Sequence, residues 1–394
     1  MFTGRNNRRH GGNKITYRPR RGLEELYFQV SMNKETLCIL GCGGFIGSHL
    51  LDRVLASKAY RVVGMDLSSK KISRHLSDKN LTFVQADIYR GKKLKECIEK
   101  SDTVISLAAL CNPSLYNTTP IRVIENNFTQ PLEVVALCAA LKKRLIHFST
   151  CEVYGRTTSS YDKKDKKQPI EIFNEDRSPF VLGPVSAQRW TYACAKQLHE
   201  RLIYAYGFEN DLAFTIVRPF NFIGPRMDFI PGVDGEGLPR VIACFMEALL
   251  FGQPLKLVDG GKNRRCFTYI DDAINAIMAI IQKPGKTRGQ IFNVGSPGNE
   301  CSISELALRM KDIYRMITGK SAKDCGKIIN VSSESFYGKG YDDSNRRVPD
   351  IAKAKKLLGW SPRVGLDEAL TKTITAYLLE YGNEPGKKGG RAWK

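Results

Sequence analysis

The chain has 394 residues, 42% of them hydrophobic, which is enough for one large or two smaller cores. Its formal net charge of +21 suits a surface that attracts nucleic acid or an anionic substrate such as a diphosphate. No segment approaches the roughly 18 apolar residues of a membrane-spanning helix, and the N-terminus has no apolar signal-peptide core. We therefore expect a cytoplasmic protein with no membrane partner.

The eleven cysteines are scattered and form no CxxC pair, which predicts buried free thiols and no metal site. Residues 1–33 lack hydrophobic periodicity and are rich in Arg, Gly and Asn, and residues 385–394 are again basic. We predict a disordered basic tail at 1–33 and a flexible C-terminus at 385–394. Within the tail, residues 24–29 resemble a protease-cleavage linker, so the tail is either an appended leader or a native extension.

From residue 36 onward, short apolar runs alternate with segments of helical spacing. Strands are predicted at 36–40, 60–66, 81–85, 103–107, 144–149 and 213–218. Helices are predicted at 46–55, about 120–141 and 189–206. Apolar strands separated by helices predict a parallel sheet covered on both faces, which is a Rossmann-type doubly wound α/β fold. We assign residues 34–220 to this nucleotide-binding domain and residues 221–384 mainly to a smaller C-terminal substrate-binding lobe.

The first predicted strand leads directly into a glycine-rich turn, residues 41–47, that opens a helix. Gly41 can form the tight turn, Gly44 lets a pyrophosphate approach the backbone, and Gly47 lets the helix pack on the sheet. The first helical residues, Phe45 and Ile46, present N–H groups that suit the phosphates of a dinucleotide.

An acidic residue, Asp66, ends the second predicted strand. An acid at this point accepts hydrogen bonds from both ribose hydroxyls and repels a 2′-phosphate. The sequence therefore predicts NAD rather than NADP as the cofactor. The alternative is that Asp66 is only a turn residue at the strand end.

Tyr192 and Lys196 are four residues apart in a predicted helix and so share one face. A phenol with a pKa of about 10 is a poor base at neutral pH, but a nearby ammonium favours the phenolate. Tyr192 can then take a proton from a substrate hydroxyl as hydride leaves the carbon, while Lys196 holds the nicotinamide ribose. Such pairs are common on solvated helices. This one is stronger because residues 149–155 end a strand where doubly wound folds bind ligands.

Four motifs, at residues 41–47, 149–155, 189–196 and 218–226, resemble those of the extended short-chain dehydrogenases/reductases. Within that group the chain is similar to UDP-glucuronate decarboxylases, including the decarboxylase domain of the bacterial polymyxin-resistance enzyme. It is more similar still to the UDP-apiose/UDP-xylose synthases, over about residues 35–379. The resemblance implies a homodimer that uses NAD to oxidise C4 of UDP-glucuronate and then releases carbon dioxide. Reduction of the resulting ketone gives UDP-xylose, and ring contraction before reduction gives UDP-apiose.

The resemblance also assigns roles to individual residues. Tyr192 matches the family's base and Lys196 its partner. Glu152 matches an acid beside the reacting ring, and Arg347 matches an arginine linked to decarboxylation. The alternative for Arg347 is a salt bridge between the lobes. The resemblance further implies that Asp87 and Ile88 contact the cofactor and that Tyr116 and Arg189 contact the sugar. It implies that the UDP is bound by Asn221, Arg240, Lys256 and Arg265. Each of the last four is otherwise an ordinary polar surface position.

Cys111 and Cys151 match cysteines that are characteristic of the apiose/xylose synthases, whereas ordinary decarboxylases usually have Ser or Thr at the second position. A thiol with an ordinary pKa of about 8.5 can shuttle protons during the ring rearrangement. The alternative is that both are small buried residues, as free cysteines often are.

Two other functions remain open on the sequence alone. A UDP-sugar 4-epimerase or 4,6-dehydratase uses the same scaffold, although Arg347 and residues 337–341 argue against it. A non-catalytic nucleic-acid-binding scaffold would explain the positive charge. That scaffold would have no chemical reason to retain Tyr192, Lys196 and Asp66, so nucleic acid is not the partner we expect.

Overall fold

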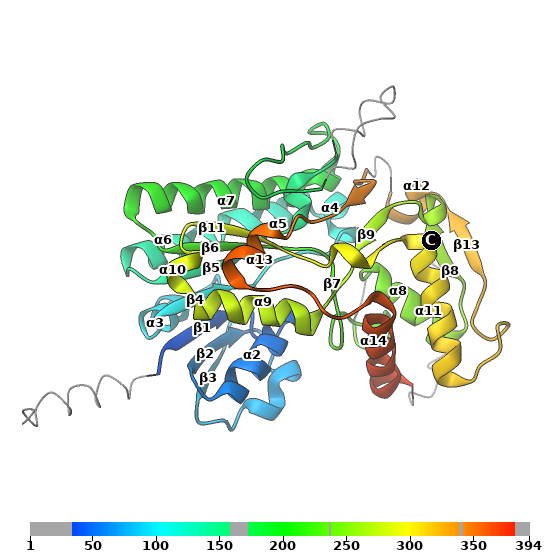
Figure 1. Ribbon diagram of the computed structural model, residues 1–394, viewed down its shortest axis with the longest axis horizontal. Coiled ribbons are helices and arrows are strands. Elements are labelled where there is room, and N and C mark those ends of the chain that lie inside the picture. Colours follow the sequence, from blue (N-terminus) through cyan, green and yellow to red (C-terminus); the bar gives the residue numbers. More distant parts are fainter. Residues whose placement is uncertain (1–33, 158–171, 236–237, 339–341, 383–394) are drawn as a thin grey trace, which may run out of the picture. The chain divides into compact units, whose positions relative to one another are not determined.

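The computed structural model describes residues 34–157, 172–235, 238–338 and 342–382 (Figure 1). Both predicted tails, 1–33 and 385–394, lie outside the described residues. No helix in the described ranges is long and apolar enough to cross a lipid bilayer. All eleven cysteines are described, and all are free thiols. Eight are buried as predicted, but Cys111 and Cys194 are exposed and Cys244 is half-buried.

The centre of the protein is a seven-stranded sheet in the order β11-β6-β5-β4-β1-β2-β3, with every neighbouring pair parallel. Its strands are β1 (Thr36–Leu40), β2 (Arg61–Asp66), β3 (Leu81–Gln85), β4 (Thr103–Ser106), β5 (Arg144–Phe148), β6 (Phe214–Pro219) and β11 (Gln290–Val294). The predicted Rossmann-type doubly wound fold is confirmed.

Helices cover both faces of this sheet, as Figure 1 shows. Alternate side chains of β1 point to opposite faces, as in any strand. Leu37 and Ile39 join one apolar cluster with α2 and α9, and Cys38 and Leu40 join a second cluster with α3, α6 and α7. The helices are α2 (Phe45–Ser57), α9 (Ile270–Gln282), α3 (Lys93–Glu99), α6 (Leu132–Ala140) and α7 (Thr191–Asn210).

The prediction of a single long helix at about 120–141 was wrong. The segment contains α5 (Pro120–Ile124), a π-helical turn (Glu125–Thr129) and α6. Pro131 has no N–H to donate, and its ring crowds the carbonyl four residues earlier, so a regular helix cannot pass through it. The backbone widens instead, and Gln130 N donates to Glu125 O at 2.8 Å across the π turn.

The segment after residue 220 does not form a separate layer, because it supplies β11 and α9 to the central sheet and its cover. Its other elements gather at one end of the sheet, near the carboxyl ends of the strands (Figure 1). The helices there are α8 (Val241–Phe251), α11 (Ile303–Thr318), α12 (Ser333–Tyr337) and α14 (Leu366–Tyr381). Shorter helices elsewhere are α4 (Ser114–Thr118), α10 (Pro284–Thr287) and α13 (Ala352–Leu358).

Three small sheets complete this end of the protein. The three-stranded one matters most for function, because it places β9 between β12 and β14. The strands of the small sheets are β7 (Phe222–Ile223), β10 (Thr268–Tyr269), β8 (Leu255–Val258), β13 (Ile328–Val331), β9 (Arg264–Cys266), β12 (Glu300–Ser302) and β14 (Arg346–Arg347).

Candidate active site

A cavity of about 820 Å³ opens beyond the carboxyl ends of the central strands. Ile46, Leu107 and Ser149, which follow β1, β4 and β5, line one side of it, and Arg265 and Arg347 from the small three-stranded sheet line another. Doubly wound folds bind their ligands at this edge, so the cavity lies where the chemistry of the fold is expected.

The glycine turn has the conformation that a tight strand-to-helix connection requires. Gly41 has φ +92°, a region that favours glycine, and its N–H donates to Met65 O at 2.8 Å. A side chain at Gly47 would collide with the Gly41 carbonyl. A side chain at Gly44 would meet only that same carbonyl, at 3.3 Å, so ligand atoms have room to approach the backbone there.

The residues around this turn fit a bound dinucleotide. The N-terminus of α2 has no side-chain cap and no acid in its first turn, so its N–H groups suit phosphate oxygens. The Asp66 carboxylate is fixed by Gly43 N at 2.9 Å and by Ser68 N at 3.1 Å, and each of its oxygens retains capacity for a ribose hydroxyl. Sequence reasoning did not single out Gly43, where a side chain would collide with Ser68 O and crowd Asp66.

Of the expected cofactor residues, Phe45 and Ile46 line the cavity, whereas Gly41, Gly44, Gly47 and Asp66 lie beside it in the glycine turn and at the end of β2. Three others are also not among the described residues that line it. Ile88 is buried in the apolar cluster beneath α3 and α6, and Asp87 Oδ1 accepts the Tyr89 N–H at 2.9 Å. The third, Lys196, is buried on α7 behind the cavity wall.

Tyr192 lines the cavity from the first turn of α7, and its ring stacks on Tyr116 with centroids 5.1 Å apart. Burial raises the pKa of Tyr192 well above its ordinary value, and a hydrogen bond with Thr150 opposes this only in part. One turn further on, Lys196 Nζ lies 3.1 Å from His147 Nε2 on β5, and burial lowers the pKa of Lys196 to about 8. In the protein groups alone, burial therefore outweighs any lowering by Lys196, and a lowered pKa of Tyr192 stays a prediction for the protein with NAD bound.

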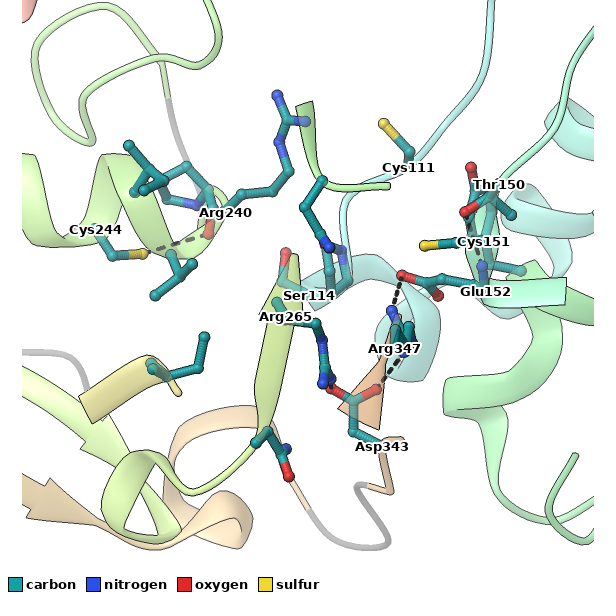
Figure 2. Close-up of a pocket in the computed structure, with 18 of the residues that line it drawn as sticks. Cys111, Ser114, Thr150, Cys151, Glu152, Arg240, Cys244, Arg265, Asp343 and Arg347 are labelled. Atoms are coloured by element: carbon teal, nitrogen blue, oxygen red, sulfur yellow. Dashed lines mark hydrogen bonds and ion pairs between the residues drawn. The ribbon is translucent and has the colours of Figure 1, made fainter. Parts of the chain in front are cut away.

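Five charged side chains form a connected cluster at the other wall, which we call the arginine box: Arg189, Arg265, Arg347, Glu152 and Asp343. Figure 2 labels the last four of them. Asp343 accepts hydrogen bonds from Arg347 at 2.6 Å, Arg265 at 2.8 Å and Arg189 at 3.2 Å. Glu152 accepts one from Arg189 at 2.7 Å and lies 3.5 Å from Arg347. Within these five side chains, positive charges outnumber negative ones by one.

Burial and the guanidinium groups act in opposite directions on the two acids of the box. Burial favours the neutral carboxyl, but Arg265, Arg189 and Arg347 outweigh it at Asp343 and lower the pKa of that group. Arg189 and Arg347 likewise lower the pKa of Glu152 against the effect of burial. Both acids are therefore ionised at neutral pH.

The box is assembled from segments that are far apart in the chain. Glu152 lies on a 3₁₀ turn after β5, and Arg189 on another 3₁₀ turn before α7. The parallel pairing of β9 and β14 places Arg265 directly opposite Arg347. Sequence reasoning missed Asp343, although its position four residues before Arg347, in a run that ends at the expected site, was a usable signal.

The two expected thiols both line the cavity, and Figure 2 shows their sulfur atoms pointing into it from the same side. The cavity walls reduce the solvation of both the exposed Cys111 and the buried Cys151 and so raise the pKa of each thiol, while Arg240 and Arg347 respectively oppose the increase. Both groups are therefore thiols rather than thiolates at neutral pH, which suits them to donate protons.

The remaining expected UDP residues line a further part of the cavity. Arg240 Nε donates to Asp228 at 3.0 Å, and its guanidinium carbon lies 5.7 Å from the centre of the Phe45 ring. Asn221 Nδ2 donates to Cys266 O at 3.1 Å, and Lys256 is exposed on β8. Asp228, which holds Arg240 in place, had not been predicted.

A glycine turn whose residues Phe45 and Ile46 border the same cavity as Tyr192, with Lys196 one helical turn behind that tyrosine, defines the class of nucleotide-dependent dehydrogenases built on the doubly wound fold. Residues 37–295 match the profile of the NAD dependent epimerase/dehydratase family, and the chain belongs to this family. The resemblance to extended short-chain dehydrogenases/reductases is thereby confirmed.

The chain is also similar to individual proteins of known activity. It is 50% identical over 353 residues to the UDP-D-apiose/UDP-D-xylose synthase of Oryza sativa subsp. japonica, covering 86% of this chain and 88% of that protein. It is 47% identical over 353 residues to UDP-D-apiose/UDP-D-xylose synthase 1 of Arabidopsis thaliana, with 86% and 90% covered.

Solved structures with the same fold include the PbgP3 protein from Burkholderia pseudomallei, with a TM-score of 0.76, 34% identity, and 88% of this chain and 96% of that chain covered. Another is the UDP-glucuronic acid 4-epimerase from Bacillus cereus in complex with UDP-glucuronic acid and NAD. Its TM-score is 0.71 at 25% identity, with 88% of this chain and all of that chain covered.

Proposed function

We propose that the protein converts UDP-glucuronate to UDP-xylose and UDP-apiose with NAD as its bound cofactor. The carrying observation is the arginine box, which presents buried guanidinium groups to the cavity that Tyr192 also lines. The identity of about half of the residues with synthases from two plants supports the same reaction.

Tyr192 acts as the base of the first step. Its oxygen takes the proton of the C4 hydroxyl, which lets the adjacent carbon–hydrogen bond break. NAD held at the glycine turn would supply the hydride acceptor for C4 and, because the hydride would return to the sugar, would not be consumed. The charge of Lys196, one turn away on the same helix, favours the Tyr192 phenolate and holds the cofactor ribose.

The arginine box binds the sugar carboxylate and then assists its departure. Oxidation at C4 creates a β-keto acid, and loss of carbon dioxide leaves an enolate whose negative charge needs stabilisation. Arg347 supplies it, since its guanidinium group lines the cavity and is held there by Asp343 at 2.6 Å. Arg189, whose guanidinium carbon lies 5.2 Å from the centre of the Tyr116 ring, orients the carboxylate with that tyrosine.

The two thiols serve the route to UDP-apiose. In that route the C2–C3 bond of the ketone opens by a retro-aldol step, and the ring recloses as a branched furanose before reduction. Both steps move protons between sugar hydroxyls and an enolate. Cys111 and Cys151, protonated at neutral pH and facing the same cavity, donate and regain these protons.

The rest of the substrate and cofactor are held by residues from both parts of the chain. We assign the dinucleotide to Gly41, Gly44, Gly47 and Asp66 in the segment 34–220. Residues 221–384 act mainly as the substrate lobe, and the UDP is held there by Asn221, Arg240, Lys256 and Arg265. Support comes from the cavity, which these four polar side chains line together.

We also propose that the protein is a homodimer of the cytoplasm. Ile121 and Ile124 on α5 and Leu198 on α7 are exposed, and these two helices pack against each other. A second copy of the same face would bury these side chains. Eleven free thiols are typical of a reducing compartment.

Product analysis by NMR, after mixing the protein with UDP-glucuronate and NAD, tests the reaction. We expect release of carbon dioxide together with UDP-xylose and UDP-apiose. Formation of UDP-galacturonate with its carboxylate retained would contradict the proposal and favour a 4-epimerase. Binding of RNA at physiological salt without turnover of any UDP-sugar would favour the non-catalytic scaffold.

A further inference from the structure

Behind the cavity wall, Lys196 belongs to a buried basic cluster with His147 and His199. His147 alternates along β5 with Ile146 and Phe148, which face α2 and α9, so its ring points to the α7 face of the sheet. Lys196 Nζ lies 3.1 Å from His147 Nε2, and the two imidazole rings are 4.4 Å apart between centroids. All three side chains are at most 2% exposed.

The direction of the Lys196–His147 hydrogen bond follows from the chemistry of the two groups. A protonated lysine has three N–H donors and no acceptor, so His147 Nε2 must accept. The ring of His147 is therefore neutral and carries its proton on Nδ1. Burial and the neighbouring Lys196 both lower the pKa of His147, and burial lowers the pKa of His199 to about 3, so both rings are uncharged.

Lys196 forms no ion pair with a carboxylate among the described residues. Glu200, one turn later on α7, is held by Arg218 of β6 through two hydrogen bonds of 3.0 and 2.6 Å, and it acts on Lys196 only through its charge, which raises the pKa of that group against the effect of burial. The other titratable groups that face this cluster or adjoin it from neighbouring elements are the Cys111 thiol, Tyr192, and Cys151 and Glu152 on the 3₁₀ turn after β5. The neutral imidazole of His147 is thus the acceptor that satisfies the buried ammonium.

We propose that His147 is a positioning residue for catalysis, which accepts an N–H of Lys196 and keeps the ammonium charged one turn behind Tyr192. A carboxylate in the same place would also accept the N–H, but it would cancel the positive charge that favours the phenolate. A neutral imidazole satisfies the donor and leaves the charge intact. The ring of His199 packs on His147 and excludes water from this hydrogen bond. The inference rests on the proposed role of Tyr192 and Lys196 in the reaction.

The pH dependence of a single turnover of NADH formation tests this role. The Lys196 ammonium is present below its pKa and is lost as the pH rises through it, so the rate falls on the alkaline side. In His147→Phe the ring volume remains but the acceptor is gone, so the alkaline midpoint should move down by about one to two pH units. His147→Gln offers a carbonyl oxygen to the same N–H and should restore most of the shift. An alkaline limb that stays in place in His147→Phe, with only the amplitude or the melting temperature reduced, would overturn the proposal.

A second measurement needs neither substrate nor a folded variant. The chain has only five histidines, so nitrogen-15 NMR of labelled histidine can resolve His147 in the wild-type protein. We expect an unprotonated Nε2 and a protonated Nδ1 at neutral pH. A protonated Nε2 would overturn the proposal whatever the reaction. Absence of carbon dioxide release together with the expected tautomer would instead overturn only the proposed function.

Discussion

The glycine turn, through Phe45 and Ile46, and the arginine box border one cavity, but they are built in different ways. The turn is continuous in sequence, and its geometry follows from local requirements such as the positive φ of Gly41 and the open space at Gly44. The box draws its five side chains from segments between Glu152 and Arg347, joined by the pairing of β9 with β14.

This difference indicates how each region tolerates change. A substitution in the turn alters a local backbone shape and should mainly affect cofactor binding. A substitution in the box removes one charge and leaves its former partners unpaired, so it should mainly affect the loss of the substrate carboxylate. Variants that separate cofactor binding from decarboxylation therefore test whether the two regions are as independent as they look.

The largest expected effect comes from Tyr192→Phe, which changes the reacting group between the two regions and leaves both intact. Loss of the base should slow NADH formation about a thousandfold, because general base catalysis typically contributes about 10²–10⁴-fold. Binding of NAD and of UDP should stay close to wild type, since the stacked ring pair with Tyr116 is preserved. Stopped-flow absorbance of NADH measures the rate, and normal turnover would remove Tyr192 from the mechanism.

Arg347→Ala should have the next largest effect, and that effect should be confined to the reaction step that the arginine box serves. We expect carbon dioxide release to slow by about a hundredfold while the initial formation of NADH changes much less, because the lost donor stabilises the enolate. The neighbouring Arg346→Ala is a matched control, since Arg346 pairs with Glu300 outside the box. Equal losses of oxidation and decarboxylation in Arg347→Ala would contradict the proposed division of roles.

Asp66→Ala tests the glycine turn, the other of the two regions. Removing the acceptor of the ribose hydroxyls should weaken NAD binding by about thirtyfold, in line with the loss of a hydrogen bond to a charged group. The ratio of carbon dioxide released to NADH formed in a single turnover should not change. Isothermal titration gives the affinity, and an altered ratio would show that the two regions are coupled.

The smallest effect is expected for Cys111→Ala. It should lower the ratio of UDP-apiose to UDP-xylose by about fivefold without stopping decarboxylation, because Cys151 still serves as a proton donor. Cys244→Ala is the control, since Cys244 also lines the cavity but donates its thiol hydrogen to Pro239 O. An unchanged product ratio in Cys111→Ala would leave Cys111 without a role in ring contraction.

The sequence predicted the fold well where the signals were local. Six strands of the sheet, the glycine turn and the helix bearing Tyr192 all follow from short-range periodicity and spacing. The seventh strand, β11, was missed because it returns to the sheet from a segment assigned mainly to the lobe. The long helix at 120–141 was wrong because the pattern of apolar residues continues through Pro131 although the backbone cannot.

The site was predictable in part for the same reason. Motif spacing led to Tyr192, and the family resemblance led to Glu152 and Arg347, but neither could show which groups lie behind or between them. Asp343 acquires its role only when β14 pairs with β9, and His147 only when α7 packs on β5. Local spacing also could not show that burial raises the pKa of Tyr192, because burial is a property of the folded chain.

The most direct measurement follows UDP-glucuronate that is isotopically labelled in its carboxyl carbon, incubated with the protein and a substoichiometric amount of NAD. The account predicts that labelled carbon dioxide accumulates well beyond the amount of NAD, because the cofactor is regenerated in each cycle, and that the pentose products carry no label. Label retained in a uronate sugar, or release that stops once NAD is used up, would contradict it.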